Sequence, residues 1–275
     1  MRVAALQFDV RRGDIAANVA AVEQGLRASQ DDGVELICLP EMWPTSFADP
    51  REDSSLIAAS QRAVERIAAL GAELDLAIVG SAFGETSAGR PTNRLHVLDQ
   101  GRAVATYDKL HLFSPTAEGE TFAAGSAPPP VVELRGARVA GLVCYDLRFP
   151  EVARDVFRRG ADLLCVPAQW PRPRETHWRA LVLGRAVEFQ GFVLATNRTG
   201  SDLVGRKRLE LEFPGNSLVC DPHGVVLAEG QGVSGLVTSD VDLDRARRLR
   251  VRVPVAKDER RDLYRHWLSE DRADP

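Results

Sequence analysis

The stretch GLVCYDLRFPE, Gly141 to Glu151, places a cysteine where an apolar run changes into a polar turn and then a helical pattern. A thiolate is a strong nucleophile, and its pKa falls when a helix N-terminus or a cation lies beside it. The helix expected to start near Pro150 would act in this way on Cys144. The position therefore predicts a reactive thiol that attacks an electrophilic carbon.

Two other apolar runs end in residues that complement such a thiol. ELICLPE ends in Glu41 and AVATYDK ends in Lys109, as VAGLVC ends in Cys144. Ligands of α/β sheets gather outside the carboxyl ends of the strands, so these three side chains could converge. Glu41 would then take the thiol proton as general base and later activate water. Lys109 would supply a cation and, with the backbone N–H of Tyr145, stabilise a developing oxyanion.

Each of these residues also has an ordinary structural explanation. Cysteine is often buried as a small hydrophobe, so the pattern around Cys144 leaves a structural and a catalytic role equally open. Glu41 or Lys109, taken alone, is better explained as a solvated residue at a strand end. A Cys–His dyad that uses His111 or His177 stays open as well, because neighbours in space need not be neighbours in sequence.

The remaining cysteines show no pattern of a metal or disulfide site. Cys38, Cys165 and Cys220 lie inside apolar runs and are predicted to be core residues. The sequence has no CxxC pair and no HExxH spacing, which argues against a structural zinc, a disulfide framework and a metallohydrolase. We therefore expect no metal and no organic cofactor.

Strand-like and helix-like segments alternate along most of the chain, which predicts an α/β layered fold. Residues 114–130, rich in Gly, Ala and Pro, are expected to form a loop. The expected helices are at 15–30, 54–74, 150–160 and 175–190, followed by a basic helix and tail. The expected strands are at 2–10, 34–41, 76–83, 137–144, 161–168 and 191–197, with a hairpin at 93–109 and three short β runs within 216–240. No break in composition marks a linker, so we expect one domain over 1–275.

The composition excludes several classes of protein. The 275 residues are 44% hydrophobic, which is enough for a sizeable core. A formal net charge of −4 gives no basic footprint for nucleic acid, and we interpret the Arg-rich pieces at 205–208 and 245–252 as solvated faces. The first residues lack the apolar region of a signal peptide, and no apolar run approaches the roughly 20 residues that span a bilayer. We expect a soluble cytoplasmic protein that binds neither nucleic acid nor membrane.

Three segments resemble, in order, the signature segments of the nitrilase superfamily of carbon–nitrogen hydrolases: LPEMWPTSF, YDKLHLF and GLVCYDLRFPE. The resemblance extends over nearly the whole chain and assigns Glu41, Lys109 and Cys144 to the Glu-Lys-Cys triad of that family. It implies a four-layer α-β-β-α sandwich. It also implies homo-oligomers, commonly dimers that pair their outer helices, with the C-terminal tail at about 255–275 in the interface. The helix at 175–190 is then a possible dimer face, although core packing explains its apolar residues equally.

Many members of that family carry a second glutamate in the loop after the lysine segment. Here the loop reads FSPTAEGETFAAG and offers Glu118 and Glu120. The spacing to Gly125 favours Glu118. Its implied role is to orient Lys109 or the substrate amide, whereas the ordinary explanation is a solvated loop acid.

The words CYDLRFPE and QWPRPRETHWRAL look most like the omega-amidase branch, which hydrolyses the terminal amide of small dicarboxylic acid monoamides such as 2-oxoglutaramate and 2-oxosuccinamate. A substrate of this kind needs a cation for its free carboxylate. Arg148 and Arg174 are the candidates, because guanidinium binds carboxylate through two parallel hydrogen bonds. Either arginine could equally be a structural ion-pair partner. The aromatic residues proposed for the pocket wall, which could equally be core residues, are Trp43, Phe47 and Trp170.

The sequence departs from this branch at two places, which leaves the substrate open. The stretch SDLVGRKRLELEFPGNS, 201–217, is longer and more basic than expected, and VEFQ at 187–190 lacks the usual Asn before its Gln. The same triad would serve a deaminated glutathione amidase, an N-carbamoyl amino acid hydrolase or a nitrilase. A family member that has lost catalysis and acts as a binding protein is the non-enzymatic alternative.

Overall fold

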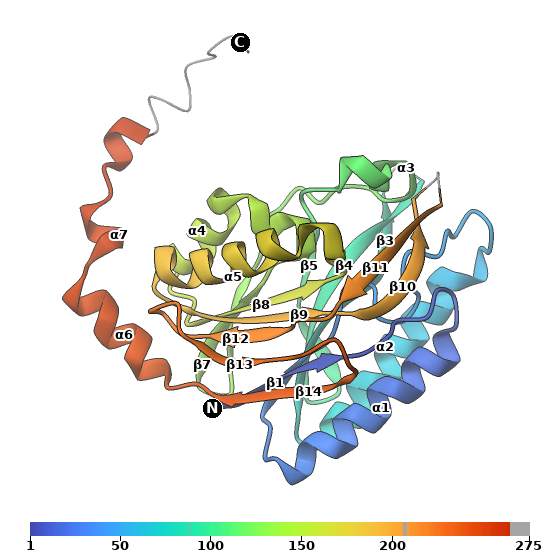
Figure 1. Ribbon diagram of the computed structural model, residues 1–275, viewed down its shortest axis with the longest axis horizontal. Coiled ribbons are helices and arrows are strands. Elements are labelled where there is room, and N and C mark those ends of the chain that lie inside the picture. Colours follow the sequence, from blue (N-terminus) through green and yellow to red (C-terminus); the bar gives the residue numbers. More distant parts are fainter. Residues whose placement is uncertain (88, 206–207, 265–275) are drawn as a thin grey trace.

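The computed structural model describes residues 1–87, 89–205 and 208–264. Its centre is a pair of six-stranded sheets that lie face to face (Figure 1). The first sheet has the strand order β14-β1-β2-β3-β4-β5. Its strands are β1 (Arg2–Gln7), β2 (Leu36–Cys38), β3 (Ala77–Ser87), β4 (Arg90–Asp99), β5 (Arg102–Asp108) and β14 (Gly235–Asp240).

The second sheet comes from the other half of the chain, in the order β13-β12-β9-β8-β7-β6. A separate two-stranded hairpin, β10 with β11, follows β9 directly. The strands of the second sheet are β6 (Val131–Leu134), β7 (Ala137–Gly141), β8 (Leu163–Ala168), β9 (Phe192–Asn197), β12 (Leu218–Cys220) and β13 (Val226–Glu229). The hairpin strands are β10 (Thr199–Val204) and β11 (Leu209–Pro214).

Two helices cover the outer face of each sheet, so the four layers are helix, sheet, sheet, helix (Figure 1). The helices α1 (Ile15–Asp31) and α2 (Ser55–Glu73) cover the first sheet. The helices α4 (Pro150–Arg158) and α5 (Glu175–Phe189) cover the second. Pro150 at the first position of α4 and Gly160 with φ +85° just after its end explain why this helix starts and stops where it does. This confirms the α/β layered fold predicted from the alternating segments and the four-layer sandwich that the resemblance to the nitrilase superfamily implied.

The core divides along the two faces of each strand, because successive side chains of a strand point to opposite sides. In β1, Val3 and Ala5 belong to the cluster between the two sheets, while Ala4 and Leu6 belong to the cluster beneath α1 and α2. Both faces of such a strand are buried, which accounts for the continuous apolar runs in the sequence. The predicted core residues Cys38, Cys165 and Cys220 are fully buried free thiols. Cys38 and Cys165 contact each other, whereas Cys220 lies against Val182 of α5.

Several predicted elements differ in extent. The strand expected at 34–41 ends at Cys38, and the strand expected to reach Cys144 ends at Gly141. The residue Cys144 instead begins a 3-10 turn, η2 (Cys144–Arg148). The loop expected at 114–130 contains a 3-10 turn, η1 (Ser114–Thr116), and a short helix, α3 (Glu118–Thr121). The hairpin β10–β11 was not among the expected elements.

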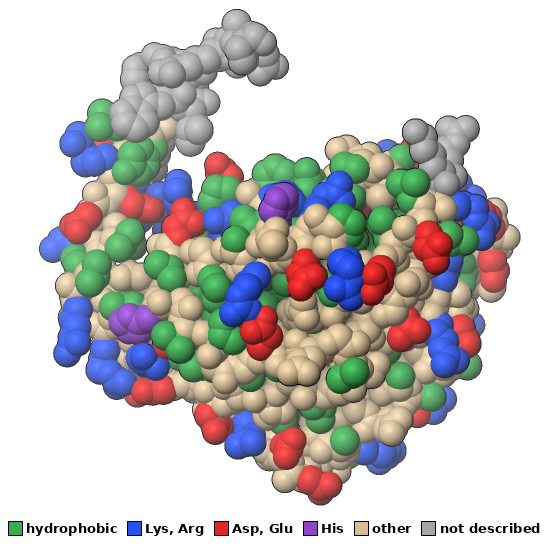
Figure 2. Space-filling view, in the orientation of Figure 1, with side chains coloured by type: hydrophobic (Ala, Val, Ile, Leu, Met, Phe, Trp, Pro, Cys, Tyr) green, Lys and Arg blue, Asp and Glu red, His purple; other side chains and the backbone are tan. Residues whose placement is uncertain are grey.

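After β14 of the first sheet, the chain continues into α6 (Leu243–Arg252) and α7 (Val255–Asp258), which lie at one end of the sandwich (Figure 1). The arginines of α6 form ion pairs with carboxylates, such as Arg247 with Asp162 at 2.7 Å and Arg245 with Asp221 at 2.9 Å. Basic and acidic side chains are intermixed over the face in Figure 2. Of the predicted interface tail, residues 265–275 lie outside the described residues. In the described part of the chain, none of the helices has both the length and the apolar character needed to cross a membrane.

Candidate active site

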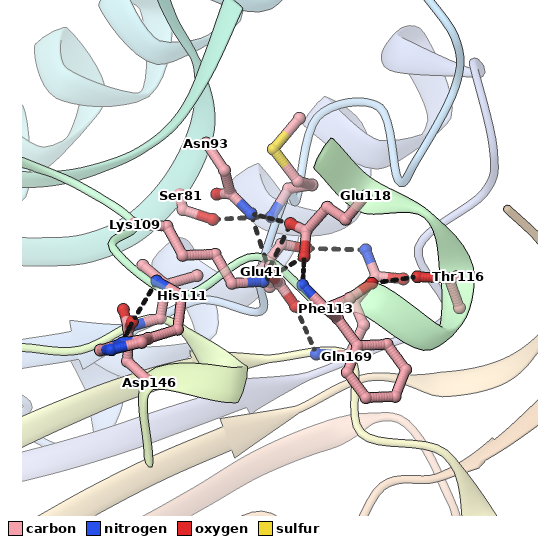
Figure 3. Close-up of polar contacts among 12 residues, drawn as sticks. Glu41, Ser81, Asn93, Lys109, His111, Phe113, Thr116, Glu118, Asp146 and Gln169 are labelled. Atoms are coloured by element: carbon pink, nitrogen blue, oxygen red, sulfur yellow. Dashed lines mark hydrogen bonds and ion pairs between the residues drawn. The ribbon is translucent and has the colours of Figure 1, made fainter. Parts of the chain in front are cut away.

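Three of the predicted side chains meet as one buried ion cluster (Figure 3). The Nζ of Lys109 lies 2.8 Å from Oε1 of Glu41 and 2.9 Å from both carboxylate oxygens of Glu118. Asn93 on β4 donates its side-chain N–H to Glu41 at 2.9 Å. Buried charges require partners of this kind, and these charges are paired and hydrogen-bonded.

Different elements deliver these groups to one place. Glu41 follows the end of β2, and Lys109 follows the end of β5, as their strand-end positions predicted. Glu118 begins α3, and it also accepts the backbone N–H of Phe113 at 2.6 Å. The alternative residue Glu120 has an exposed side chain. The geometry therefore favours Glu118 as the second glutamate.

Cys144 completes the group from the other sheet. It starts η2 with φ +44°, a left-handed conformation that is unfavourable for a residue with a side chain. The Glu41 carboxylate and the backbone N–H of Gln169 both lie close enough to its thiol to affect the pKa of that thiol. The sharp turn after β7 thus presents the sulfur to groups that belong to the first sheet.

The cluster is acidic, because two carboxylates surround one ammonium. Burial raises the pKa of Glu41, and the Glu118 carboxylate raises it too, although Lys109 lowers it. Burial acts against the charge of Lys109, but Glu118 and Glu41 outweigh burial and hold the pKa of Lys109 well above its ordinary value. The stable resting arrangement therefore has a charged lysine.

The prediction of a lowered thiol pKa at Cys144 was wrong. Burial raises the pKa of this thiol well above its ordinary value, and the Glu41 charge raises it further, while Lys109 lowers it. The helix α4 starts only at Pro150, and η2 separates Cys144 from its N-terminus. A neutral thiol beside a carboxylate of raised pKa is the arrangement of an acid–base pair, in which the proton passes to Glu41 as the sulfur attacks.

The cluster forms the floor of a mostly apolar pocket. The pocket is lined by the four residues predicted to bind substrate, Arg148, Arg174, Trp170 and Phe47. Tyr145, the predicted oxyanion residue, lines it as well. Further lining residues are Phe113, Thr116, Gln169, Pro171, Val204, Leu211 and Phe213.

Trp43 does not line this pocket. Its side chain is 2% exposed and packs in the cluster beneath α1 and α2. The ordinary explanation, a core aromatic, is the correct one for Trp43.

The two arginines of the pocket differ from most other arginines of the chain. Arg148 stacks over the Trp170 ring at 5.0 Å, and Arg174 stacks over the Phe113 ring at 5.3 Å. Within residues 1–87, 89–205 and 208–264, neither forms an ion pair with an acidic side chain. The alternative of a structural ion-pair partner is therefore not what the structure has. Two guanidinium groups held by aromatic rings remain available to a carboxylate in the pocket.

The two histidines proposed for a Cys–His dyad have other partners. The ring of His111 lies 2.8 Å from Oδ1 of Asp146 and stacks on Phe149, and His177 lies 3.1 Å from the Arg148 guanidinium. Among the described residues, no group of three or more His, Cys, Asp or Glu side chains is arranged to hold a metal ion.

Sequence reasoning missed three polar residues of the site, Asn93, Asp146 and Gln169. Gln169 donates its backbone N–H to Oε2 of Glu41 at 3.1 Å and its side-chain N–H to the Glu41 carbonyl at 2.8 Å. It follows the end of β8, so the strand-end argument could have found it. Asn93 lies within β4, where nothing in the pattern distinguishes it from a surface residue.

Comparisons with known proteins agree with this geometry. The model of the carbon–nitrogen hydrolase family matches residues 2–251. The chain is 34% identical over 263 residues to the 2-oxoglutaramate amidase of Bacillus subtilis, covering 95% of this chain and 98% of that protein. It is 35% identical to the omega-amidase YafV of Escherichia coli K12, covering 86% of this chain and 87% of that protein.

A solved structure of a mutant of the amidase from Nesterenkonia sp. AN1 superimposes with a TM-score of 0.85 at 26% identity, covering 97% of this chain and 96% of that one. That structure carries the acetamide moiety of fluoroacetamide covalently added at its active site cysteine. The matches in sequence, fold and length lead to one conclusion. This chain belongs to the carbon–nitrogen hydrolase family and is a hydrolase of non-peptide carbon–nitrogen bonds.

Proposed function

We propose that the enzyme is an omega-amidase, which hydrolyses the terminal amide of a small carboxylate-bearing substrate to a dicarboxylate and ammonia. 2-Oxoglutaramate and 2-oxosuccinamate represent this substrate class. The observation that carries the proposal is the pocket itself, which Arg148 and Arg174 line together with Glu41, Lys109 and Cys144. The names of the relatives from B. subtilis and E. coli support the same substrate class.

In the acylation step, the Glu41 carboxylate takes the proton of the Cys144 thiol while the sulfur attacks the amide carbon. The carbonyl oxygen gains the negative charge, and the Lys109 ammonium and the Tyr145 N–H stabilise it. The tetrahedral intermediate then breaks its C–N bond, and Glu41 gives its proton to the leaving ammonia. The product of this step is a thioester on Cys144.

In the deacylation step, Glu41 takes a proton from water, and the resulting hydroxide attacks the thioester carbon. The C–S bond breaks, the acid leaves, and the proton returns from Glu41 to the sulfur. The raised pKa of Glu41 suits a group that gains and loses a proton in each half of the reaction. Glu118 is the supporting residue, because its two oxygens hold the Lys109 ammonium in place.

The test is ammonia release from a panel of 2-oxoglutaramate, 2-oxosuccinamate, deaminated glutathione, N-carbamoyl amino acids, aliphatic amides and nitriles. We expect the oxo-acid amides to react fastest and Cys144→Ala to abolish the reaction. Mass spectrometry of enzyme quenched during turnover should find the acyl adduct on Cys144. Turnover confined to carbamoyl compounds or nitriles would overturn the substrate, and an adduct on another cysteine would overturn the nucleophile.

We further propose that the enzyme is a cytoplasmic homodimer. All four cysteines are free thiols, a state that a reducing compartment such as the cytoplasm maintains.

The proposed dimer face is the outer side of α5. Trp178 and Val182 of this helix are buried in the core, but Val187 is 51% exposed on the outer face of the sandwich. Light scattering should give the mass of a dimer for the wild type and of a monomer for Val187→Asp. Val233→Asp, at an exposed position before β14, is the control and should remain dimeric.

A further inference from the structure

The segment 201–217, whose length and charge set it apart in the sequence, contains β11 and most of β10, the two strands of the separate hairpin. In an antiparallel pair, directly opposed residues point their side chains to the same face. Asp202 opposes Leu211, and Val204 opposes Leu209. These four residues therefore share the face that is turned toward the body of the protein, where Asp202 and Val204 are buried.

Part of this inward face is a wall of the active-site pocket. Val204, Leu211 and Phe213 all line the pocket that holds Cys144. Leu209, on the same face but nearer the tip of the hairpin, does not line it and is 47% exposed. The wall is apolar, whereas the cationic part of the pocket comes from the turns that follow β7 and β8.

The wall is fixed to the loop that carries the catalytic glutamate. Oδ2 of Asp202 accepts the hydroxyl of Ser46 at 2.5 Å and the Arg198 guanidinium at 3.3 Å. Arg198 also donates to Gln169 at 3.1 Å and stacks over the Phe213 ring at 4.6 Å. On the outer face of the hairpin, Glu212 pairs with Arg172 at 2.7 Å. A wall held at both faces keeps a constant distance from the reacting atoms.

We propose that Val204 and Leu211 determine which acyl chain the enzyme accepts, by setting the space between the hairpin and Cys144. The inference rests on the proposed amidase function and defines its substrate more closely. The carboxylate of the substrate faces the arginines, and its methylene chain lies against the hairpin. A methylene that fits or misses an apolar pocket changes kcat/KM by about 10-fold or more.

The experiment compares kcat/KM for 2-oxo acid monoamides with one, two and three methylene groups. Leu211→Ala and Val204→Ala each enlarge the pocket, so the ratio of the longest to the shortest substrate should rise about 10-fold. Leu209→Ala is the matched control, because it removes the same side-chain atoms as Leu211→Ala from the same strand but outside the pocket. Its ratio of kcat/KM for the longest and the shortest substrate should stay within about twofold of the wild-type ratio. An equal loss on all three substrates, or the same shift in Leu209→Ala, would overturn the proposal.

A second readout separates this proposal from the choice of substrate. The rate of Cys144 alkylation by 2-chloroacetamide and by 2-chlorohexanamide is measured by mass spectrometry and requires no turnover. Leu211→Ala should raise the rate of the bulky reagent relative to the small one. Suppose that the wild type hydrolyses no oxo-acid amide but the ratio of the bulky to the small alkylation rate rises in Leu211→Ala. The proposed substrate would then be wrong, and the proposed role of the hairpin would be supported. If this ratio of alkylation rates does not change, the proposed role of Val204 and Leu211 is contradicted, whatever the substrate is.

Discussion

At the scale of single residues, the notable property of the site is its charge balance. A lysine between two glutamates leaves a buried cluster with a surplus negative charge. Burial first, and then the charge of Glu41, raise the pKa of the neighbouring Cys144 thiol and keep it protonated. Burial, and to a smaller extent the charge of Glu118, also raise the pKa of Glu41 and make it a stronger base than an isolated carboxylate. Glu118, which we do not expect to touch the reacting proton, therefore controls its transfer.

Glu118→Gln tests this control through the pH dependence of kcat/KM. Activity requires ionised Glu41, so the rate falls as the pH drops below the pKa of Glu41, which is raised above its ordinary value. Removing the Glu118 charge removes one cause of that raised pKa, so the acidic limb of the profile should move to lower pH. An acidic limb that stays in place, or moves to higher pH, would contradict the assignment.

At the scale of elements, Asp146 joins the lysine segment to the cysteine turn. Its Oδ1 accepts the backbone N–H of His111 at 2.9 Å, and its Oδ2 accepts the Tyr107 hydroxyl at 2.9 Å and the Val143 N–H at 3.2 Å. Lys109 lies between two of these partners in the chain, and Cys144 follows the third. The Asp146 carboxylate thus fixes the distance between Lys109 and Cys144.

Asp146→Asn should lower kcat with little change in KM, because an amide cannot accept all of these hydrogen bonds. A misplacement of about 1 Å costs up to about 100-fold in rate, so we expect a loss of about 10- to 100-fold. Asp162→Asn is the matched control, since Asp162 is equally buried but lies before β8 and pairs with Arg247. The control should lose stability but keep its kcat. A large rise in KM in Asp146→Asn, with kcat unchanged, would contradict a positioning role.

The elements also show which parts of the structure could be predicted from the sequence. The strands before Glu41 and Cys144 can be recognised because they are buried and therefore read as consecutive apolar residues. The strand before Lys109 is mostly exposed and was recognised from its hairpin pattern. The hairpin β10–β11 escaped recognition because its inward face contains Asp202, a charge that breaks the alternation of polar and apolar residues. That charge is stabilised by Arg198, four residues earlier, and by Ser46, which lies 156 residues away in the chain and which no local pattern reports.

At the scale of the whole molecule, one largely buried histidine, His96, couples stability to pH. Burial lowers the pKa of His96 on β4 to about 4 from 6.5, with Arg94 lowering it further. Below pH 6.5 the unfolded chain therefore binds a proton that the folded chain does not, so stability falls as the pH falls toward 4. Between pH 7 and pH 5 this group alone should cost about 2 kcal/mol.

Urea unfolding at pH 7 and pH 5 measures this effect. Between pH 7 and pH 5, the free energy of unfolding of His96→Leu should fall by about 2 kcal/mol less than that of the wild type. His223→Leu, at an exposed histidine, should lose as much as the wild type. Equal losses in all three proteins would assign the acid sensitivity to other groups.

The division of the site between the two sheets has a practical consequence for protein engineering. Residues 1–126 carry Glu41, Lys109 and Glu118, and residues 127–275 carry Cys144 and the pocket arginines. A cut between the exposed residues Ser126 and Ala127 would yield a split enzyme in which neither fragment holds a full set of reacting groups. The second fragment still supplies β14 as the partner strand of β1. Ammonia release on mixing would then be a direct signal that two fragments, or two proteins fused to them, have come together.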